Sequence, residues 1–488
     1  MHKQHAANTP FLAAMQRYLA ENAAPFHTPG HKLGVGVHES LRQQIGPAAF
    51  SLDLTCVPGL GDLFDKQGPI QDSQKQAAAL YGADASYYLV NGTTGGIYAM
   101  LLTTVGPGEK IILPRNVHRS VIGGLILSGA IPVFVSPALD SRLQIAMNVP
   151  ASSYAEAMRL HPDAKAVLLI NPTYYGVVAE IAAITEQAHQ RGMVVLVDEA
   201  HGPHLHFFDD LPPSALDIGA DLVVQSSHKI LSAMSQASLL HCRLGRIDQG
   251  RLESMLQLVQ SSSPNYLLLA SLEAAVAQLA EAGPQLIGRS VALAKQARQQ
   301  INQIEGLYCF GEDCIGRPGV AGVDVTKLVV TVSGLGIGGN AAETWLRQQG
   351  KLQAELSDLN NVLFLVTLAD DAASLDRLVI ALTRLAAEIA PDGKQVANVT
   401  MPVAELVALP ALSPRDATFA RRRRMPFAEA AGQIAGETVT SYPPGIPLLF
   451  PGERITAEVI AYCQVLQRQG CKILGPSDPT LSTVEVVA

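Results

Sequence analysis

Short runs of apolar residues alternate with helical patterns through the first half of the chain. From about residue 70, stretches with helical spacing, such as QDSQKQAAALYGA (71–83), separate runs rich in β-branched and aromatic residues. These runs are SYYLV (86–90), KIILP (110–114), IPVFVS (131–136), AVLLI (166–170), MVVLVDEA (193–200), DLVVQSS (221–227) and SLLHCR (238–243). Helices between buried strands imply crossover connections, so we predict an α/β domain whose mainly parallel sheet has helices on both faces.

The flanking patterns divide the rest of the chain. We expect an N-terminal helix and arm over 1–35, ending in the loop FHTPGHKLGVG, and a large domain over 36–304, because helical periodicity continues from residue 266 to about 304. New strand and helix patterns predict a smaller α/β domain over 305–390. Four prolines mark 391–415 as a linker, and 416–488 forms a C-terminal unit.

Composition narrows the classes of function. The chain has 488 residues, of which 48% are hydrophobic, and its net charge of -8 gives no indication of nucleic acid or an anionic membrane as a partner. Its six cysteines are scattered without a CxxC pair, which fits a reducing compartment. The N-terminus lacks an apolar signal core, and no run of about 18 apolar residues occurs. We therefore expect a soluble, cytoplasmic protein.

Three segments at the ends of predicted strands carry candidate chemistry. The first is YYLVNGTTGGIYAML (87–101), in which Gly92, Thr93 and Thr94 connect a strand to a helix. Small residues let N–H groups at a helix start approach an anion, and the threonine hydroxyls add donors, so a phosphate cradle is plausible. A plain strand–turn–helix connection is the alternative, because the segment is neither a Walker loop nor a GxGxxG motif.

The second segment is MVVLVDEAHGPHLHF (193–207). Asp198 ends a predicted buried strand, where open parallel sheets bind ligands, and a carboxylate in that position needs a partner. A metal is one alternative, because Glu199, His201, His204 and His206 are close in sequence. However, the spacing is not HExxH, and only alternate residues of an extended segment share a face. We expect no metal, and we expect His204 and His206 to be ordinary surface histidines.

The third segment is SSHKILSAMSQAS (226–238), in which Lys229 follows a predicted strand. A lysine in a strand-end pocket loses its proton more easily and becomes a nucleophilic amine, whereas most lysines lie on solvated loops. The combination of a phosphate cradle, a strand-end carboxylate and a strand-end lysine matches what pyridoxal 5′-phosphate requires. Its phosphate needs donors, its ring nitrogen needs an acid and its aldehyde needs an amine.

These segments resemble the ornithine/lysine/arginine decarboxylases, a family with the fold-type-I, aspartate-aminotransferase-like architecture. The segment around Lys229 is similar to the cofactor-attachment signature of that family, and similar segments recur from about residue 26 to 453. They are FHTPGHKLG, LVNGTTGG, PRNVHRS, NPTYYG, VDEAHGPH, SSSPNYLLLASLE and YPPGIPLLFPGE. The chain departs from the family pattern at GDLFDKQGPI (61–70), which leaves a substrate contact by Asp62 in doubt.

The resemblance implies roles for individual residues. Lys229 would be the Schiff-base lysine, Asp198 the partner of the pyridine nitrogen, His118 the histidine that stacks on the cofactor ring, and His201 a residue near the reacting carbon. The phosphate would be held by a set of small and polar residues: Gly92, Thr93, Thr94, Ser226 and His228. The family also implies a homodimer with shared active sites, which Ser262 and Ser263 would reach from the partner subunit.

The activity implied is decarboxylation of a basic amino acid. Short members of this kind are similar to arginine decarboxylases that make agmatine for polyamine synthesis, so we expect arginine, with lysine or ornithine as alternatives. Protonation of the α-carbon by His201 or by the released Lys229 remains open. A fold-type-I aminotransferase or aldolase is a more distant alternative, for which three arginines could bind a substrate carboxylate: Arg347, Arg377 and Arg384. A cofactor-free binding protein would not need both Asp198 and Lys229.

Overall fold

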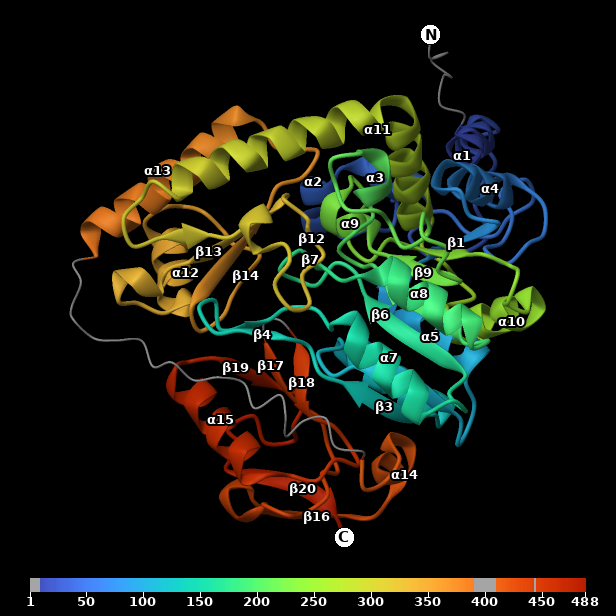
Figure 1. The fold of residues 1–488 in the computed structure, drawn as a ribbon. Coiled ribbons are helices and arrows are strands. Elements are labelled where there is room, and N and C mark those ends of the chain that lie inside the picture. The colour runs from blue at the N-terminus through green and yellow to red at the C-terminus, as the bar shows by residue number, and fades with distance from the viewer. Residues whose placement is uncertain (1–8, 390–409, 443–444) are drawn as a thin grey trace.

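A seven-stranded sheet forms the centre of the computed structural model, which describes residues 9–389, 410–442 and 445–488 (Figure 1). In spatial order its strands are β1 (Ala85–Leu89), β10 (Ser238–Cys242), β9 (Leu222–Gln225), β8 (Val194–Asp198), β6 (Ala166–Ile170), β2 (Lys110–Pro114) and β3 (Ile131–Val135). The strands from β9 to β3 pair in parallel, and β10 runs antiparallel to both of its neighbours. The predicted mainly parallel α/β sheet is thus confirmed.

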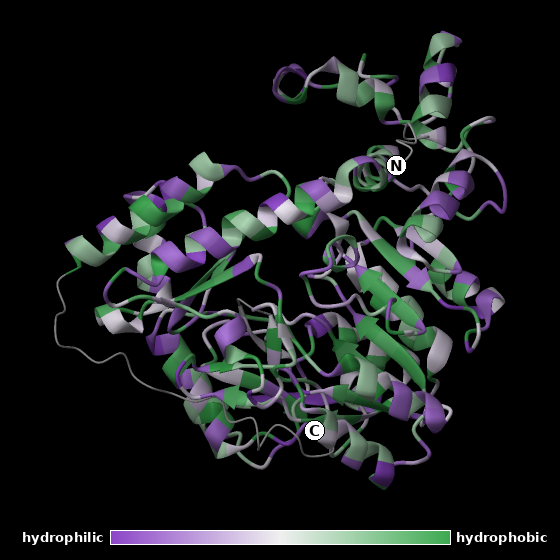
Figure 2. Ribbon diagram, turned by 45° about the horizontal axis from the view of Figure 1, so that its top comes forward, coloured by the Kyte–Doolittle hydropathy of each residue, from purple (hydrophilic) through white to green (hydrophobic). Residues whose placement is uncertain are grey.

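Helices cover both faces of this sheet, because its strands carry apolar side chains on both sides. One apolar cluster joins a face of the sheet to α5 (Gly92–Thr104), α6 (Arg119–Ser128) and α10 (Gln249–Val259). The other cluster joins the opposite face to α1 (Pro10–Ala20), α4 (Pro69–Tyr81), α7 (Ala151–Leu160), α8 (Ile181–Gln190) and α11 (Tyr266–Ile301). Accordingly, the strands are mostly green in Figure 2, whereas the outer helices mix green and purple.

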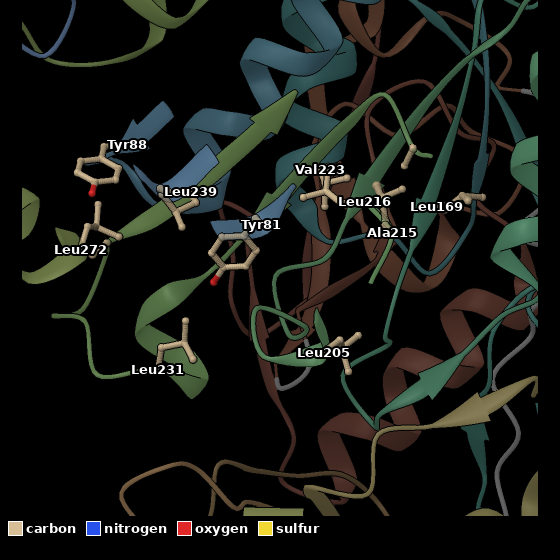
Figure 3. Close-up of a cluster of buried hydrophobic side chains, with 14 of the residues drawn as sticks. Tyr81, Tyr88, Leu169, Leu205, Ala215, Leu216, Val223, Leu231, Leu239 and Leu272 are labelled. Atoms are coloured by element: carbon tan, nitrogen blue, oxygen red, sulfur yellow. The ribbon is translucent and has the colours of Figure 1, made fainter. Parts of the chain in front are cut away.

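The core also holds one of the loops that follow the strands. Tyr81 and Tyr88 are buried in the second cluster, part of which is shown in Figure 3. The hydroxyl of Tyr81 donates to the carbonyl of Pro203 at 3.1 Å, and the hydroxyl of Tyr88 lies 2.6 Å from that of Ser73. The polar ends of these large side chains are thus satisfied, and the loop after β8 is tied to the core.

A second sheet lies beside the first, and α11 packs against both. Its strands, in spatial order, are β11 (Tyr308–Cys309), β13 (Lys327–Thr331), β15 (Asn361–Leu365) and β14 (Leu356–Ser357), covered by α12 (Gly339–Gln348) and α13 (Ala372–Glu388). Helix α11 leaves helical geometry at Ala282, two residues before Pro284, as expected for a proline within a helix. This bend lets α11 pack against both sheets.

The C-terminal part forms a third body. Its elements are α14 (Pro414–Phe419), β16 (Arg422–Pro426), β17 (Val439–Tyr442), β18 (Ile446–Leu449), α15 (Ala457–Arg468), β19 (Lys472–Leu474) and β20 (Thr483–Val487). Most of the linker expected at 391–415 lies outside the described residues. The smaller elements elsewhere are α2 (Glu39–Ile45), α3 (Pro47–Leu52), β4 (Leu139–Asp140), β5 (Ile145–Ala146), β7 (Val177–Val178), α9 (Ser227–Ile230) and β12 (Gly322–Val323). None of the described helices is long and apolar enough to cross a membrane.

A buried ion pair fastens the C-terminal body to the large sheet. Arg115, directly after β2, donates through Nε and Nη2 to the carboxylate of Glu453 at 3.1 and 2.9 Å. Its Nη1 donates to the carbonyl of Pro447 at 2.7 Å, and its guanidinium lies 5.5 and 5.1 Å from the ring centroids of Phe134 and Phe450. The bidentate geometry fixes both partners. The C-terminal body is therefore held against the loop that follows β2.

Candidate active site

One cavity lies at the carboxyl ends of the parallel strands. Its empty volume is about 600 Å³, and it is lined by residues from the loops after β2, β6, β8 and β9 together with the start of α5. Strands that run in the same direction bring their following loops to one edge of the sheet. The residues that line it are Thr93, Asn116, His118, Ala146, Ile170, Pro172, Thr173, Tyr174, Tyr175, Asp198, Ala200, His201, Lys229 and Ile446. Five predicted site residues thus meet here.

Lys229 lies in the short helix α9, directly after β9. Its Nζ is 2.8 Å from Nε2 of His201 and 5.4 Å from the centroid of the Tyr174 ring. Burial lowers the pKa of Lys229 to about 8, and this effect outweighs the carboxylates of Asp198 and Glu355, which raise it. With this pKa about a tenth of the molecules carry a neutral amine at pH 7, far more than for an ordinary lysine, so Lys229 is suited to act as a nucleophile.

Asp198 ends β8 inside the cavity and is 7% exposed. Among the described residues, the hydrogen bond to its carboxylate is donated by the backbone N–H of Ala200 to Oδ1 at 3.2 Å. Burial raises the pKa of Asp198, while the charge of Lys229 lowers it. A buried carboxylate with so few donors fits a protonated ring nitrogen, which would supply both a positive charge and a hydrogen bond.

The start of α5 and the residues around the start of α9 form a region suited to binding an anion. The first N–H groups of a helix have no acceptor within it, and here they face a second cavity that adjoins Lys229. Oγ of Ser226 donates to Oγ1 of Thr93 at 3.4 Å, which places two hydroxyls side by side. The lining includes the residues predicted to hold the phosphate: Gly92, Thr93, Thr94, Ser226 and His228. Hydroxyls and free N–H groups fit a phosphate monoester.

The glycines after Thr94 have a different use from the one suggested by the sequence. A Cβ on Gly96 would lie 2.6 Å from Cγ1 of Val224 and 2.7 Å from Cδ1 of Leu89. Gly96 therefore allows α5 to pack directly on the sheet, and it does not serve to approach an anion. The close packing points the start of α5 at the cavity.

The surroundings of both cavity histidines, of which His201 is buried and His118 partly buried, favour the neutral ring. His118 caps α6, since its Nδ1 accepts a hydrogen bond from the N–H of Ser120 at 3.3 Å. Burial lowers the pKa of His118 to about 4, and the charge of Lys229 contributes. Burial, with Lys229, also lowers the pKa of His201 well below its ordinary value, and its ring lies 4.6 Å from that of Tyr174. Neutral rings can pack against a flat ligand or accept a proton.

The other acidic and histidine side chains near Asp198 in sequence interact with partners that do not line the cavity. The Glu199 carboxylate accepts from the Ser214 hydroxyl at 2.8 Å, and Nδ1 of His206 lies 2.7 Å from Asp217. The prediction that His204 is a surface residue is wrong, because its side chain is 0% exposed and lies 3.2 Å from Oδ2 of Asp324. Within the described ranges, no group of three or more His, Cys, Asp or Glu is arranged to hold a metal ion.

Some predicted residues lie away from both cavities. Ser262 and Ser263 are exposed between α10 and α11. Asp62 accepts a hydrogen bond from the thiol of Cys56 at 3.1 Å and lines neither cavity. The three arginines considered for a substrate carboxylate are exposed and also line neither cavity: Arg347, Arg377 and Arg384.

Tyr174 and Glu355 are among the lining residues that were not assigned roles from the sequence. Tyr174 belongs to the segment NPTYYG directly after the strand AVLLI, so its strand-end position was a usable signal. Glu355 precedes β14 in the second sheet and lines the second cavity beside Lys229. Nothing in the local sequence around Glu355 indicates this position, because it depends on how the two sheets pack.

Comparisons with known proteins show which family and fold this chain resembles. Residues 9–374 match the family described as "Orn/Lys/Arg decarboxylase, major domain", and residues 395–475 match "Orn/Lys/Arg decarboxylase, C-terminal domain". The chain is 42% identical to arginine decarboxylase of Bacillus subtilis over 98% of each chain. It is 26% identical to a lysine decarboxylase of Pseudomonas aeruginosa, covering 92% of this chain and 74% of that protein. The structure of the Francisella novicida lysine decarboxylase matches with a TM-score of 0.85 and 20% identity, covering 99% and 81% of the two chains.

The charge of Asp198 is expected to control the acidity of Lys229. In cofactor-free protein, Asp198→Asn removes a carboxylate that raises the pKa of Lys229, so this pKa should fall below its value of about 8. The change in this pKa is measured from the pH dependence of Lys229 acylation by an amine-reactive acylating reagent, followed by peptide mass spectrometry.

Glu199→Gln provides the matched control. Glu199 is buried beside Asp198, but its carboxylate accepts from Ser214, Ala215 and Gln225. The pH profile of Lys229 should not change in this variant. An unchanged or higher pKa in Asp198→Asn would contradict the assigned coupling.

Proposed function

Because the chain belongs to the Orn/Lys/Arg decarboxylase family, we propose that it converts L-arginine to agmatine and carbon dioxide with pyridoxal 5′-phosphate as its cofactor. The observation that carries this proposal is the pairing of a buried strand-end carboxylate, Asp198, with a buried amine, Lys229, in one cavity. The choice of arginine is supported by the 42% identity to an arginine decarboxylase across nearly the whole chain.

Different cavity residues would bind different parts of the cofactor. The start of α5, with the hydroxyls of Thr93 and Ser226, would hold the phosphate, and Lys229 would bind the aldehyde carbon. Asp198 would keep the ring nitrogen protonated, and His118 would pack on the ring. When bound, pyridoxal 5′-phosphate supplies a conjugated, positively charged ring that accepts the electron pair left by the departing carbon dioxide.

Lys229 and His201 are close enough to each other to transfer a proton. Their nitrogens are 2.8 Å apart, and both groups are driven towards the neutral form by burial. A Lys229 Nζ that is not bound to the cofactor would lie within hydrogen-bond distance of the imidazole. With a pKa of about 8, a free Lys229 amine still carries a proton in most molecules at neutral pH, and we propose that the Lys229–His201 pair delivers this proton to the α-carbon in place of the carboxyl group.

Glu355 is the residue we assign to the distal cation of the substrate. Asp198 and Glu355 are the two carboxylates among the residues lining the two cavities, and Asp198 lies at the strand end where the ring nitrogen is expected. Glu355 faces Lys229 from the second sheet and raises its pKa by its charge. A glutamate carboxylate can accept two parallel N–H bonds from a guanidinium.

The cavity composition also argues against transamination. Aminotransferases usually anchor the α-carboxylate with an arginine, and no arginine is found among the described residues lining the two cavities. A carboxyl group that must leave as neutral carbon dioxide is better placed in an apolar setting than beside a cation. The apolar residues near Lys229 provide such a setting: Ala146, Ile170, Pro172 and Ile446.

We further propose a homodimer with shared active sites. Ser262 and Ser263 are exposed and lie outside the cavities of their own chain, which leaves them free to contact a second subunit. The apolar side chains of Phe26 and Val35 in the N-terminal arm are also highly exposed, at 95% and 87%. Light scattering on the purified protein should give the mass of two chains or a multiple of it, and a monomer mass would contradict this proposal.

Carbon dioxide release tests the reaction and its substrate. The purified enzyme with cofactor is expected to release carbon dioxide fastest from arginine, and Lys229→Ala should reduce turnover by at least about 10³-fold, since it removes the nucleophile. Release from none of arginine, lysine and ornithine would refute the decarboxylase, and preference for lysine or ornithine would refute the choice of arginine.

Replacement of Glu355 tests the distal site. Glu355→Gln should lower kcat/KM for arginine by roughly 10- to 100-fold, because a hydrogen bond to a charged group contributes about 1.5–3 kcal/mol. Most of the change should appear in KM, since the guanidinium is remote from the reacting bond. Glu388→Gln on the exposed face of α13 is the matched control and should be neutral. Unchanged KM in Glu355→Gln would remove Glu355 from substrate binding.

A further inference from the structure

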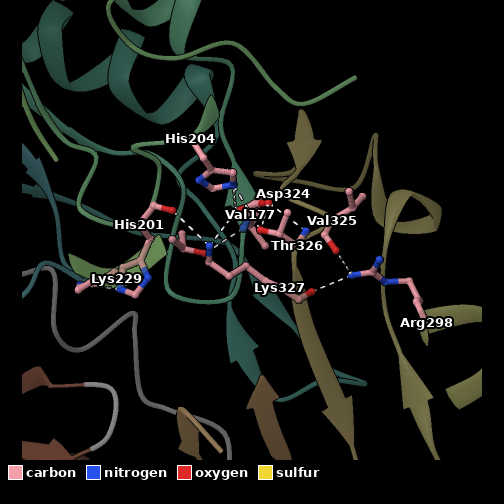
Figure 4. A network of polar contacts seen from close by, with 10 residues as sticks. Val177, His201, His204, Lys229, Arg298, Asp324, Val325, Thr326 and Lys327 are labelled. Carbon is pink, nitrogen blue, oxygen red and sulfur yellow. Dashed lines mark hydrogen bonds and ion pairs between the residues drawn. The ribbon is translucent and has the colours of Figure 1, made fainter. Parts of the chain in front are cut away.

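Three charged or titratable side chains are enclosed between the two sheets. Nζ of Lys327 donates to Oδ2 of Asp324 at 2.8 Å, and Nε2 of His204 lies 3.2 Å from the same oxygen (Figure 4). All three side chains are 0% exposed. Thr326 donates from its hydroxyl to Oδ1 of Asp324 at 2.6 Å, so both carboxylate oxygens are occupied. None of the four lines the catalytic cavity.

His204 belongs to the loop after β8, and one further hydrogen bond connects the network to His201 in the same loop. Nζ of Lys327 also donates to the backbone carbonyl of His201 at 3.2 Å, as Figure 4 shows. Nε2 in the ring of His201 lies 2.8 Å from Nζ of Lys229. Lys327 is therefore connected to the catalytic amine of Lys229 through a single residue, His201, although it belongs to the second sheet.

The same segment also fixes the loop after β6. Strand β12 pairs antiparallel with β7, and the N–H of Asp324 donates to the carbonyl of Gly176 at 2.8 Å. A Cβ on Gly176, which has a φ of +85°, would lie 2.9 Å from the Asp324 carbonyl oxygen and from Cγ of Lys327. Only glycine allows this approach. The loop continues to Tyr174, whose ring packs on His201.

A buried ion pair is weak evidence of a purely stabilising role. A buried ion pair can often be replaced by apolar residues without loss of stability, whereas removing one partner alone is strongly destabilising. The charge of Lys327 holds the pKa of Asp324 well below its ordinary value despite burial, so the carboxylate is ionised. What an apolar pair would lack is the N–H donor to the carbonyl of His201. That donor is the feature connected to catalysis.

We propose that Lys327, held by Asp324, is a positioning residue that fixes the backbone of His201 and thereby the distance between the His201 ring and Lys229. The assignment rests on the proposed reaction, in which His201 and Lys229 transfer the proton. It also makes the contact between the two sheets a condition for a correctly placed imidazole, because the donor comes from one sheet and the acceptor from the other.

A pair of double variants separates positioning from stability. Lys327→Met with Asp324→Asn removes both charges and the donor, and Lys327→Gln with Asp324→Asn removes both charges but keeps an N–H donor. We expect both holoenzymes to melt within a few degrees of each other. The Met form should lose roughly 10- to 100-fold in kcat with KM nearly unchanged, as expected for a misplaced group, and the Gln form should recover most of this loss.

Visible circular dichroism of the bound cofactor gives a second readout that does not depend on turnover. The Met form should alter the cofactor band, because the neighbouring imidazole shifts, and the Gln form should restore it. Asp221→Asn is the control: Asp221 is a buried carboxylate at the opposite edge of the sheet, 2.9 Å from His189. It should lower Tm and leave the band and kcat unchanged.

Equal kcat and equal cofactor bands in the Met and Gln forms would overturn the assignment, as would recovery of full activity in the Met form. If the parent enzyme releases no carbon dioxide from any basic amino acid, the proposed function fails. The dichroism and melting comparisons would still decide whether Lys327 positions His201.

Discussion

The shared direction of β2, β6, β8 and β9 is the constraint on which the site depends. Each strand ends at the same edge of the sheet, so the loops that carry His118, Tyr174, Asp198 and Lys229 meet although up to 111 residues separate them in sequence. The start of α5 reaches the same edge because β1, which precedes it, runs in the same direction as β9, and Gly96 permits close packing on the sheet. Reversal of one strand would move a catalytic group to the other end of the domain.

Exclusion of water sets the chemistry of this edge. Burial lowers the pKa of Lys229 and raises that of Asp198, so each group is moved towards its neutral form and each opposes that shift in the other. A cationic ring nitrogen beside Asp198 would restore the carboxylate charge, and the amine would be free to react. The same low-dielectric surroundings would strengthen the attraction between carboxylate and ring.

Local sequence patterns were sufficient for the strands and for the residues at their ends. The seven apolar runs correspond to strands, and Asp198 and Lys229 were recognised from their strand-end positions. The antiparallel β10 was not predicted, because its apolar run is the same in either direction. His204 was misassigned to the surface, since its burial depends on Asp324, 120 residues further along the chain. Glu355 was missed for the same physical reason, as its role arises from packing between distant segments.

Substrate length is a consequence of how the separate bodies are joined. The groups that act on the α-carbon belong to the large sheet, whereas Glu355, assigned to the distal cation, precedes β14 in the second sheet. The distance between these two ends is held by α11, which packs against both sheets, and by the buried contact of Asp324 with His204. Ile446 enters the cavity from the C-terminal body, which the pair of Arg115 and Glu453 holds in place. Under the proposed assignment of Glu355, selection among basic amino acids would depend on these inter-body contacts as well as on the residues that touch the substrate.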